Sequence, residues 1–165
     1  MSLNQSFISE FEQEAKSTKK VLERVPIEKA DWKPHEKSMS LGRLSTHVAE
    51  LPSWLDVTLN SDELDFAKVE YKPRIAASSA ELIHIFEENY SKGLKAIKNA
   101  TDEVLMSNWT MRNGEQIFFT LPKIAVIRST VYNHLYHHRA QLGVYLRLLN
   151  VPLPAIYGPT ADEPM

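Results

Sequence analysis

The sequence predicts an all-α protein built as a four-helix bundle. Four segments repeat apolar residues at spacings near 3.6, which is typical of helices that bury one face. Prolines and polar clusters separate these segments, without long low-complexity linkers between them. The length of 165 residues is close to the usual size of one domain. We therefore expect residues 1–165 to form a single domain.

The first two predicted helices cover residues 4–24 and a segment that begins near Ser40. Pro26 ends the first helix, because proline has no backbone N–H to continue the hydrogen-bond ladder. The second helix carries one apolar stripe, which consists of Leu41, Leu44, Val48, Leu51 and Leu55. Pro52 lies within this stripe, so we expect the second helix to kink there.

The third and fourth predicted helices cover residues 79–100 and 123–149. Ser79 is the expected N-cap of the third helix, and Pro122 comes directly before the fourth. The intervening segment "TDEVLMSNWTMRNGEQIFFTLPK" lacks helical periodicity, and its Asn-Gly pair predicts a turn within a loose or short extended connection. Residues 150–165 contain four prolines and are expected to form an irregular tail.

Composition and charge exclude several classes of protein. Nineteen Lys and Arg residues against 21 Asp and Glu residues leave a formal charge of -2, which gives no electrostatic reason to expect nucleic-acid binding. Cysteine is absent, which excludes disulfides, thiolate metal ligands and a cysteine nucleophile. No apolar run approaches the roughly 20 residues of a membrane span, and the first residues do not resemble a signal peptide. These observations favour a soluble cytoplasmic protein.

The stretch "VYNHLYHHRAQL" places three of the six histidines within five positions. On a helical wheel, His138 falls inside the apolar stripe of its helix and His134 falls at the edge of that stripe, while His137 points away. His134 and His138 are four residues apart, the spacing that lets two imidazoles of one helix bind the same metal ion. A rotation of this helix would let His137 replace His138, so His137 remains an alternative ligand.

His47 flanks the apolar stripe of the second helix in the same way. Three inward histidines from two packed helices could supply three neutral ligands and leave a position open for water or substrate, as in catalytic zinc sites. The alternative is a hydrogen-bonded polar cluster, which would need buried partners for six ring nitrogens. Imidazole ligands suit zinc, nickel, iron and copper. His84 and His35 are expected to be solvent-exposed or structural.

Other side chains near the predicted site are weaker candidates. Glu50 follows His47 by one turn and could orient a ligand or accept a proton, although a solvated carboxylate is the alternative. Trp54 could line a pocket or belong to the core. Tyr136 and Arg139 lie off the face that bears His134 and His138, so we expect them to contact another helix or a second subunit.

Two segments resemble the DinB/YfiT-like family of metal-dependent four-helix-bundle proteins: "DWKPHEKSMSLGRLSTHVAELPSW" and "NHLYHHRAQLGVYLRLLNVPLPAIYGPTADE". The order of a helix, a His-bearing helix, a helix and an H-x-x-x-H helix extends the resemblance over nearly the whole chain. The resemblance implies an up-down-down-up bundle, a divalent metal ion on His47, His134 and His138, and frequent homodimers. The family name refers to DNA-damage induction, which implies a bacterial stress response but not DNA binding.

Relatives within this fold include transferases and isomerases that use a low-molecular-weight thiol such as bacillithiol or mycothiol. The predicted function is therefore a transferase or hydrolase that acts on a small molecule with such a thiol or with metal-activated water. A divalent ion, expected to be zinc, nickel or iron, lowers the pKa of a bound water or thiol when its ligands are neutral histidines. The alternative is a metal-binding or stress-associated structural protein without turnover. Different activities share this metal motif, so the substrate is not implied.

Overall fold

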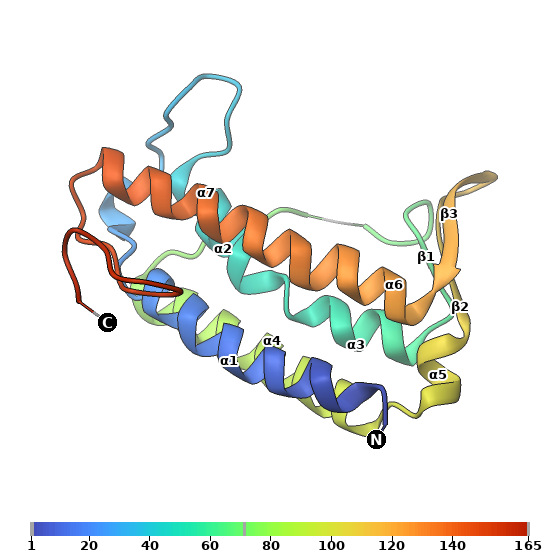
Figure 1. The fold of residues 1–165 in the computed structure, drawn as a ribbon. Helices are drawn as coiled ribbons and strands as arrows, with labels where there is room; N and C mark the ends of the chain where they lie inside the picture. The colour runs from blue at the N-terminus through green and yellow to red at the C-terminus, as the bar shows by residue number, and fades with distance from the viewer. Residues whose placement is uncertain (1, 71, 165) are drawn as a thin grey trace.

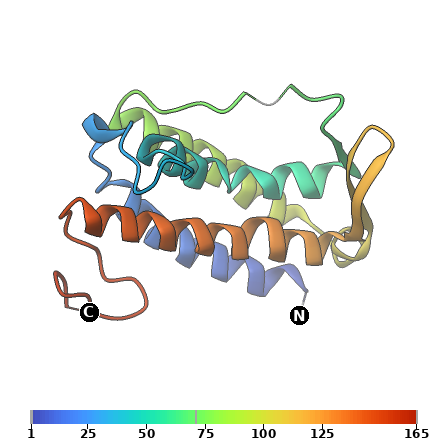
Figure 2. The ribbon, with the colours of Figure 1, turned by 90° about the horizontal axis from the view of Figure 1, so that it is seen from above.

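The computed structural model describes residues 2–70 and 72–164, most of them helical. In chain order its elements are α1 (Asn4–Leu22), a 3₁₀ turn (Ile27–Lys29), α2 (Leu41–Glu50), α3 (Ser53–Asn60), β1 (Glu63–Asp65), α4 (Ser79–Asn99), α5 (Asp102–Met106), β2 (Asn108–Asn113), β3 (Gln116–Pro122), α6 (Lys123–Ile127), a π-helical segment (Arg128–Asn133) and α7 (His134–Leu148). The long helices lie side by side, and the strands gather at one end of them (Figures 1 and 2).

The three strands correct the prediction of an all-α fold. Their order in the sheet is β1-β2-β3, with β1 parallel to β2 and β2 antiparallel to β3. The expected turn joins β2 to β3, and Gly114 adopts a φ of +57°, a conformation that glycine accepts without a steric penalty. The sequence did not predict β1 or α5, because elements of three and five residues are too short to show a period.

The predicted second helix is two helices, α2 and α3, that meet at Leu51 and Pro52. Ser40 caps α2, since its hydroxyl accepts a hydrogen bond from the backbone N–H of Arg43 at 3.2 Å. Near the break, side chains satisfy two helix-end carbonyls: Ser53 donates to Glu50 at 2.8 Å, and Asn89 donates to Ala49 at 3.2 Å. The kink expected at Pro52 is therefore a complete interruption of the helix.

Helix α4 matches the predicted third helix, but its N-cap is Ser78 and not Ser79. The Ser78 hydroxyl accepts a hydrogen bond from the backbone N–H of Glu81 at 3.1 Å, and the Glu81 carboxylate accepts one from the backbone N–H of Ala77 at 2.7 Å. This reciprocal arrangement leaves Ser79 as the first helical residue.

The predicted fourth helix contains a feature that the sequence did not indicate. Residues Arg128–Asn133 are π-helical, so the regular α-helical turn resumes only at His134. A π-helical turn holds more residues than an α-helical turn, and such segments occur frequently at functional sites. After α7, residues 150–164 are irregular, as predicted for the tail.

Two clusters of buried hydrophobic residues form the core along the helices. One cluster centres on residues of α2, α4 and α7, and the other on residues of α1, α3 and the π-helical segment. Trp54 and Tyr90 are half-buried and pack against both clusters. Among the described residues, no helix combines the length and the apolar character that a membrane span requires.

Gly93 of α4 allows close contact with the break between α2 and α3. A β-carbon at Gly93 would lie 2.6 Å from the carbonyl oxygen of Pro52, whereas one at Gly143 of α7 would meet nothing within 4 Å. We expect Gly93→Ala to lower the free energy of unfolding by about 1–2 kcal/mol, because overpacking outweighs the gain in helix propensity. The matched variant Gly143→Ala should raise it by about 0.5–1 kcal/mol. Urea unfolding measures both, and stabilisation by Gly93→Ala would contradict this account of the contact.

Candidate metal centre

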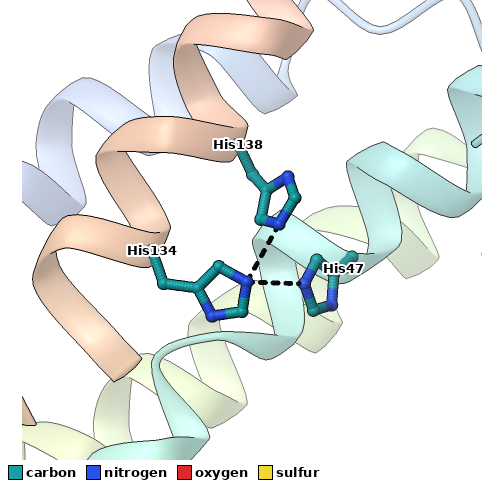
Figure 3. A group of neighbouring side chains, drawn as sticks. All are labelled: His47, His134 and His138. Atoms are coloured by element: carbon teal, nitrogen blue, oxygen red, sulfur yellow. Dashed lines mark hydrogen bonds between the residues drawn. The ribbon is translucent and has the colours of Figure 1, made fainter. Parts of the chain in front are cut away.

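The structure brings together the three histidines that the sequence selected. His47 projects from α2, and His134 and His138 project from α7 toward it (Figure 3). The Nε2 atom of His134 lies 3.4 Å from Nε2 of His47 and 2.9 Å from Nε2 of His138. The candidate ligand atoms of all three lie within 4.8 Å of one another, so this three-histidine cluster could hold a metal ion.

The packing of α2 against α7 sets this geometry. Both helices bury apolar residues in the same core cluster, among them Leu44, Val48, Leu135 and Leu142. The imidazoles lie beside this stripe and are half-buried. The helix contact that buries the apolar side chains therefore also faces the imidazoles toward one another.

The other three histidines lie outside the cluster. His137 is exposed, although its ring centroid is only 4.9 Å from that of His138. His84 and His35 are also exposed, as the sequence predicted for His84. Of these two neighbours, His138 lies against His47, with 4.7 Å between the ring centroids, and the choice of His138 as a ligand stays a prediction.

Carbonyl groups lie beside the outer ring nitrogens of His134 and His138. Nδ1 of His134 lies 3.3 Å from the backbone carbonyl of Thr130, and Nδ1 of His138 lies 2.7 Å from the side-chain carbonyl of Gln141. A carbonyl oxygen only accepts, so these partners favour the tautomer that carries its proton on Nδ1 and a lone pair on Nε2. In that tautomer the two Nε2 atoms at 2.9 Å present lone pairs to each other, whereas a proton on either Nε2 makes the contact the hydrogen bond drawn in Figure 3.

Such a pair of nitrogens fits a shared cation. Two nitrogens at about 2.0–2.1 Å from a tetrahedral zinc ion are roughly 3.3 Å apart, close to the separations of 2.9 and 3.4 Å in the cluster. Carbonyl partners on the far ring nitrogens are also what metal-bound histidines use to hold their orientation. The donor set therefore fits a divalent ion of the type that imidazole prefers.

His47 has a different partner. Its Nδ1 atom lies 3.4 Å from the guanidinium of Arg43, which only donates hydrogen bonds. In the metal-free ring this contact favours a proton on Nε2, which can donate to His134. Binding of a cation at Nε2 would move the His47 proton to Nδ1, and the contact with Arg43 would then have to lengthen.

Burial keeps the cluster neutral. Desolvation, followed by the neighbouring His138, His134 and Arg43, lowers the pKa of His47 from 6.5 to about 4. Desolvation also lowers the pKa of His134 and that of His138, against the hydrogen bonds from these rings to Thr130 and Gln141. At neutral pH the three rings are uncharged, which is the form that binds metal ions.

Glu50 is not a solvated carboxylate, which was the alternative to a role beside the predicted metal site. It is half-buried and forms ion pairs with Arg43 at 3.1 Å and with Arg74 at 3.5 Å. Together with His47 and Trp54 it lines a cavity of about 340 Å³. Trp54 is thus both a core residue and a lining residue of this cavity.

Sequence reasoning missed several residues that contact the cluster. Arg43 precedes His47 by four residues, Thr130 precedes His134 by four and Gln141 follows His138 by three. Helical spacing of three or four was therefore a signal that could have found all three. Arg74 comes from an irregular segment, and no pattern in the sequence places it beside Glu50.

Tyr136 and Arg139 contact another helix, α1, which was one of the two expectations from the sequence; the other was a second subunit. The Tyr136 hydroxyl donates to Glu10 at 2.6 Å, and Arg139 pairs with Glu14 at 2.6 Å. Arg139 is only 4% exposed. These two residues therefore connect α7 to α1 and lie outside the three-histidine cluster.

Comparison with known proteins identifies the family. A family model described as the DinB family matches residues 1–164. The chain belongs to the DinB family. The uncharacterized protein YrdA of Bacillus subtilis (strain 168) is 27% identical over 161 residues, which cover 95% of this DinB-family chain and 89% of YrdA.

Two solved structures share the fold of this DinB-family protein. A DinB-like protein from Bacillus cereus ATCC 10987 gives a TM-score of 0.68 at 20% identity, over 92% of this chain and 95% of that one. The DinB-like protein YjoA from Bacillus subtilis gives a TM-score of 0.71 at 18% identity, over 92% of this chain and 98% of that one. The expected family is thereby confirmed, and the fold is that of DinB-like proteins.

The lowered pKa values predict how pH changes the stability of the metal-free protein. Below about pH 6.5 the unfolded chain binds protons at these histidines while the folded protein does not, so the free energy of unfolding decreases as pH falls toward 4. We expect a loss on the order of 2 kcal/mol from His47 between pH 6.5 and pH 4. Chelator-treated protein unfolded in urea at several pH values measures it.

The variant His47→Asn should flatten this dependence, and the variant of an exposed histidine, His84→Asn, should leave it unchanged. The decisive range lies between pH 6.5 and about 4.5, above the range in which the carboxylates titrate. Equal slopes for the chain with His47 and for His47→Asn would contradict burial of a neutral imidazole.

Proposed function

We propose that this DinB-family protein is a divalent-metal-dependent enzyme, a transferase or hydrolase whose ion is held by His47, His134 and His138. One observation carries the proposal: the Nε2 atoms of His134 and His138 lie 2.9 Å apart beside a third imidazole. When both rings carry their protons on Nδ1, a cation between the Nε2 atoms satisfies both lone pairs, and burial disfavours the charged, doubly protonated ring that could otherwise do so. The cavity next to His47 supports a site that a small molecule can reach.

Each residue of the centre has a separate task in this proposal. The three histidines hold the ion, while Thr130 and Gln141 orient two of the rings through their Nδ1 protons. When bound, a divalent ion on neutral ligands keeps its charge and lowers the pKa of a nearby water or thiol, which supplies a nucleophile near neutral pH. The chain has no cysteine, so a thiol nucleophile would come from a low-molecular-weight cofactor.

A non-catalytic metal-binding or stress-associated protein is the second candidate, and the state of Glu50 favours it. Glu50 is the only carboxylate among the described residues that line the cavity, and it pairs with two guanidinium groups. Each of its two carboxylate oxygens contacts one guanidinium group, so accepting a substrate proton would require breaking an ion pair. Turnover would then depend on the ion alone.

Domain organisation, helix topology and oligomeric state complete the proposal. We infer that residues 1–165 form one domain, a four-helix bundle of up-down-down-up type. The two core clusters that share Trp54 and Tyr90 support a single unit. Exposed Val144 and Leu148 on α7 support a homodimer, since apolar side chains exposed on one helix are common at subunit contacts. We also infer a cytoplasmic protein with small-molecule substrates, since a net charge of -2 gives no electrostatic reason to expect nucleic-acid partners.

Metal analysis of purified protein tests the ligand set. We expect His47→Ala, His134→Ala and His138→Ala each to lower the affinity for zinc or nickel at least tenfold, because each removes one of three ligands. The matched control is His137→Ala, which removes a neighbouring exposed histidine and should leave the affinity unchanged. The proposal fails if all four variants bind the ion as the unchanged protein does.

Assays of the metal-loaded protein then separate the two candidate functions. Turnover of electrophiles with a thiol such as bacillithiol, or hydrolysis without one, should disappear in His134→Ala. Absence of turnover over a broad panel, with the ion bound, would favour the non-catalytic candidate.

A further inference from the structure

The cavity beside His47 has an apolar wall and a polar end. It lies between the interrupted helix α2–α3, strand β1 with the segment that follows it, and α4. The apolar wall consists of Trp54, Val57, Leu64, Phe66 and Val69. The polar end includes His47, Glu50, Arg74 and Asn89. We call this cavity the His47 cleft.

Two large apolar side chains of this wall are exposed to solvent. Phe66 is 38% exposed and Val69 is 49% exposed, yet both line the same cavity as half-buried Trp54. Exposed apolar side chains that converge on a concave surface are typical of ligand sites. A cavity of about 340 Å³ is within the usual range for a small molecule.

Strand β1 fixes the orientation of this wall. Leu64 and Phe66 are two residues apart and face the same side, and Asp65 between them faces the opposite side. The Asp65 carboxylate, 5% exposed, accepts hydrogen bonds from the backbone N–H groups of Ala67 at 3.0 Å and Gly114 at 2.9 Å. These bonds tie the segment that carries Phe66 to the β2–β3 turn, so the wall is a built feature of the fold.

The polar end of the cleft favours an anionic group. The Arg74 side chain is 53% exposed and lies 3.5 Å from Glu50, whose carboxylate also contacts Arg43. A cation at the three-histidine cluster would add positive charge at His47, on the same end of the cleft. With that ion bound, the ion and Arg74 together outweigh the single carboxylate of Glu50, so a carboxylate or thiolate would be attracted to this end more strongly than a cationic group.

We infer that the His47 cleft binds small molecules that combine an apolar body with an anionic head group. The aromatic or aliphatic body packs against Trp54 and Phe66, and the head group lies between Arg74 and the three-histidine cluster. The inference rests on the proposed function for the role of this ligand as substrate. Its apolar part can be tested without any metal ion.

The test compares phenylbutanoate, butanoate and phenylbutanol by calorimetry on protein whose zinc content has been measured. We expect phenylbutanoate to bind at least tenfold more tightly than butanoate, because only its ring can pack against the apolar wall. It should also bind several-fold more tightly than phenylbutanol, which lacks the charge. Equal affinities for phenylbutanoate and butanoate would overturn the inference.

Variants locate the binding. Phe66→Ala and Val69→Ser should each weaken phenylbutanoate binding, about tenfold for Phe66→Ala, and Arg74→Gln should remove most of its advantage over phenylbutanol. The matched control Ile117→Ala changes a residue of β3 that is 59% exposed and does not line the cleft, and should have no effect. Because all four residues are substantially exposed, circular dichroism should show an unchanged fold. Full affinity in both Phe66→Ala and Val69→Ser would overturn the inference.

Failure of the cleft and failure of the metal centre give different results. If the protein holds no ion but phenylbutanol still binds and depends on Phe66, the cleft stands and the proposed metal-dependent function fails. If the ion binds and the affinity for phenylbutanoate is unchanged in the Phe66, Val69 and Arg74 variants, the metal centre stands and the cleft inference fails.

Discussion

The constraint on which the rest of the molecule depends is the close approach of neutral imidazoles between α2 and α7. The Nε2 atoms of His134 and His138 lie 2.9 Å apart, and the carbonyl partners of their Nδ1 atoms, Thr130 and Gln141, favour a lone pair on each Nε2. Burial lowers the pKa of both rings, so a charged ring is favoured only in acid. A divalent ion between the rings would satisfy both lone pairs at neutral pH. The ordinary helix packing that brings these rings together is therefore also what favours a cation.

Two interruptions of helical regularity flank this centre. The break at Pro52 comes one turn after His47, and the π-helical segment ends directly before His134. The first interruption turns α3 away from the line of α2, and Gly93 of α4 permits the close contact at this break. Trp54, in the first turn of α3, then lies both in the core and in the wall of the His47 cleft. The irregular backbone thus joins the metal centre to the cavity where a ligand can approach it.

The main helices and the three-histidine cluster were predictable because periodicity decides both. A period of 3.6 identifies α1, α2 with α3, α4 and α7, and it separates inward His138 from exposed His137. The same period does not reveal β1, whose three residues are ordered by pairing with β2 and by the hydrogen bond from the Gly114 N–H to Asp65. It also does not indicate the π-helical segment. Arg74 reaches Glu50 from an irregular segment, so only the tertiary fold could reveal this pair. Local patterns predict the helices and the three-histidine cluster, while long-range contacts form the cleft.

X-ray absorption spectroscopy of the zinc-loaded protein reports the atoms bound to the ion without an assay or a substrate. We expect three imidazole nitrogens at about 2.0–2.1 Å from the ion, and the loss of one imidazole in His134→Ala. An all-oxygen shell, or a spectrum that is the same in His134→Ala, would contradict this expectation.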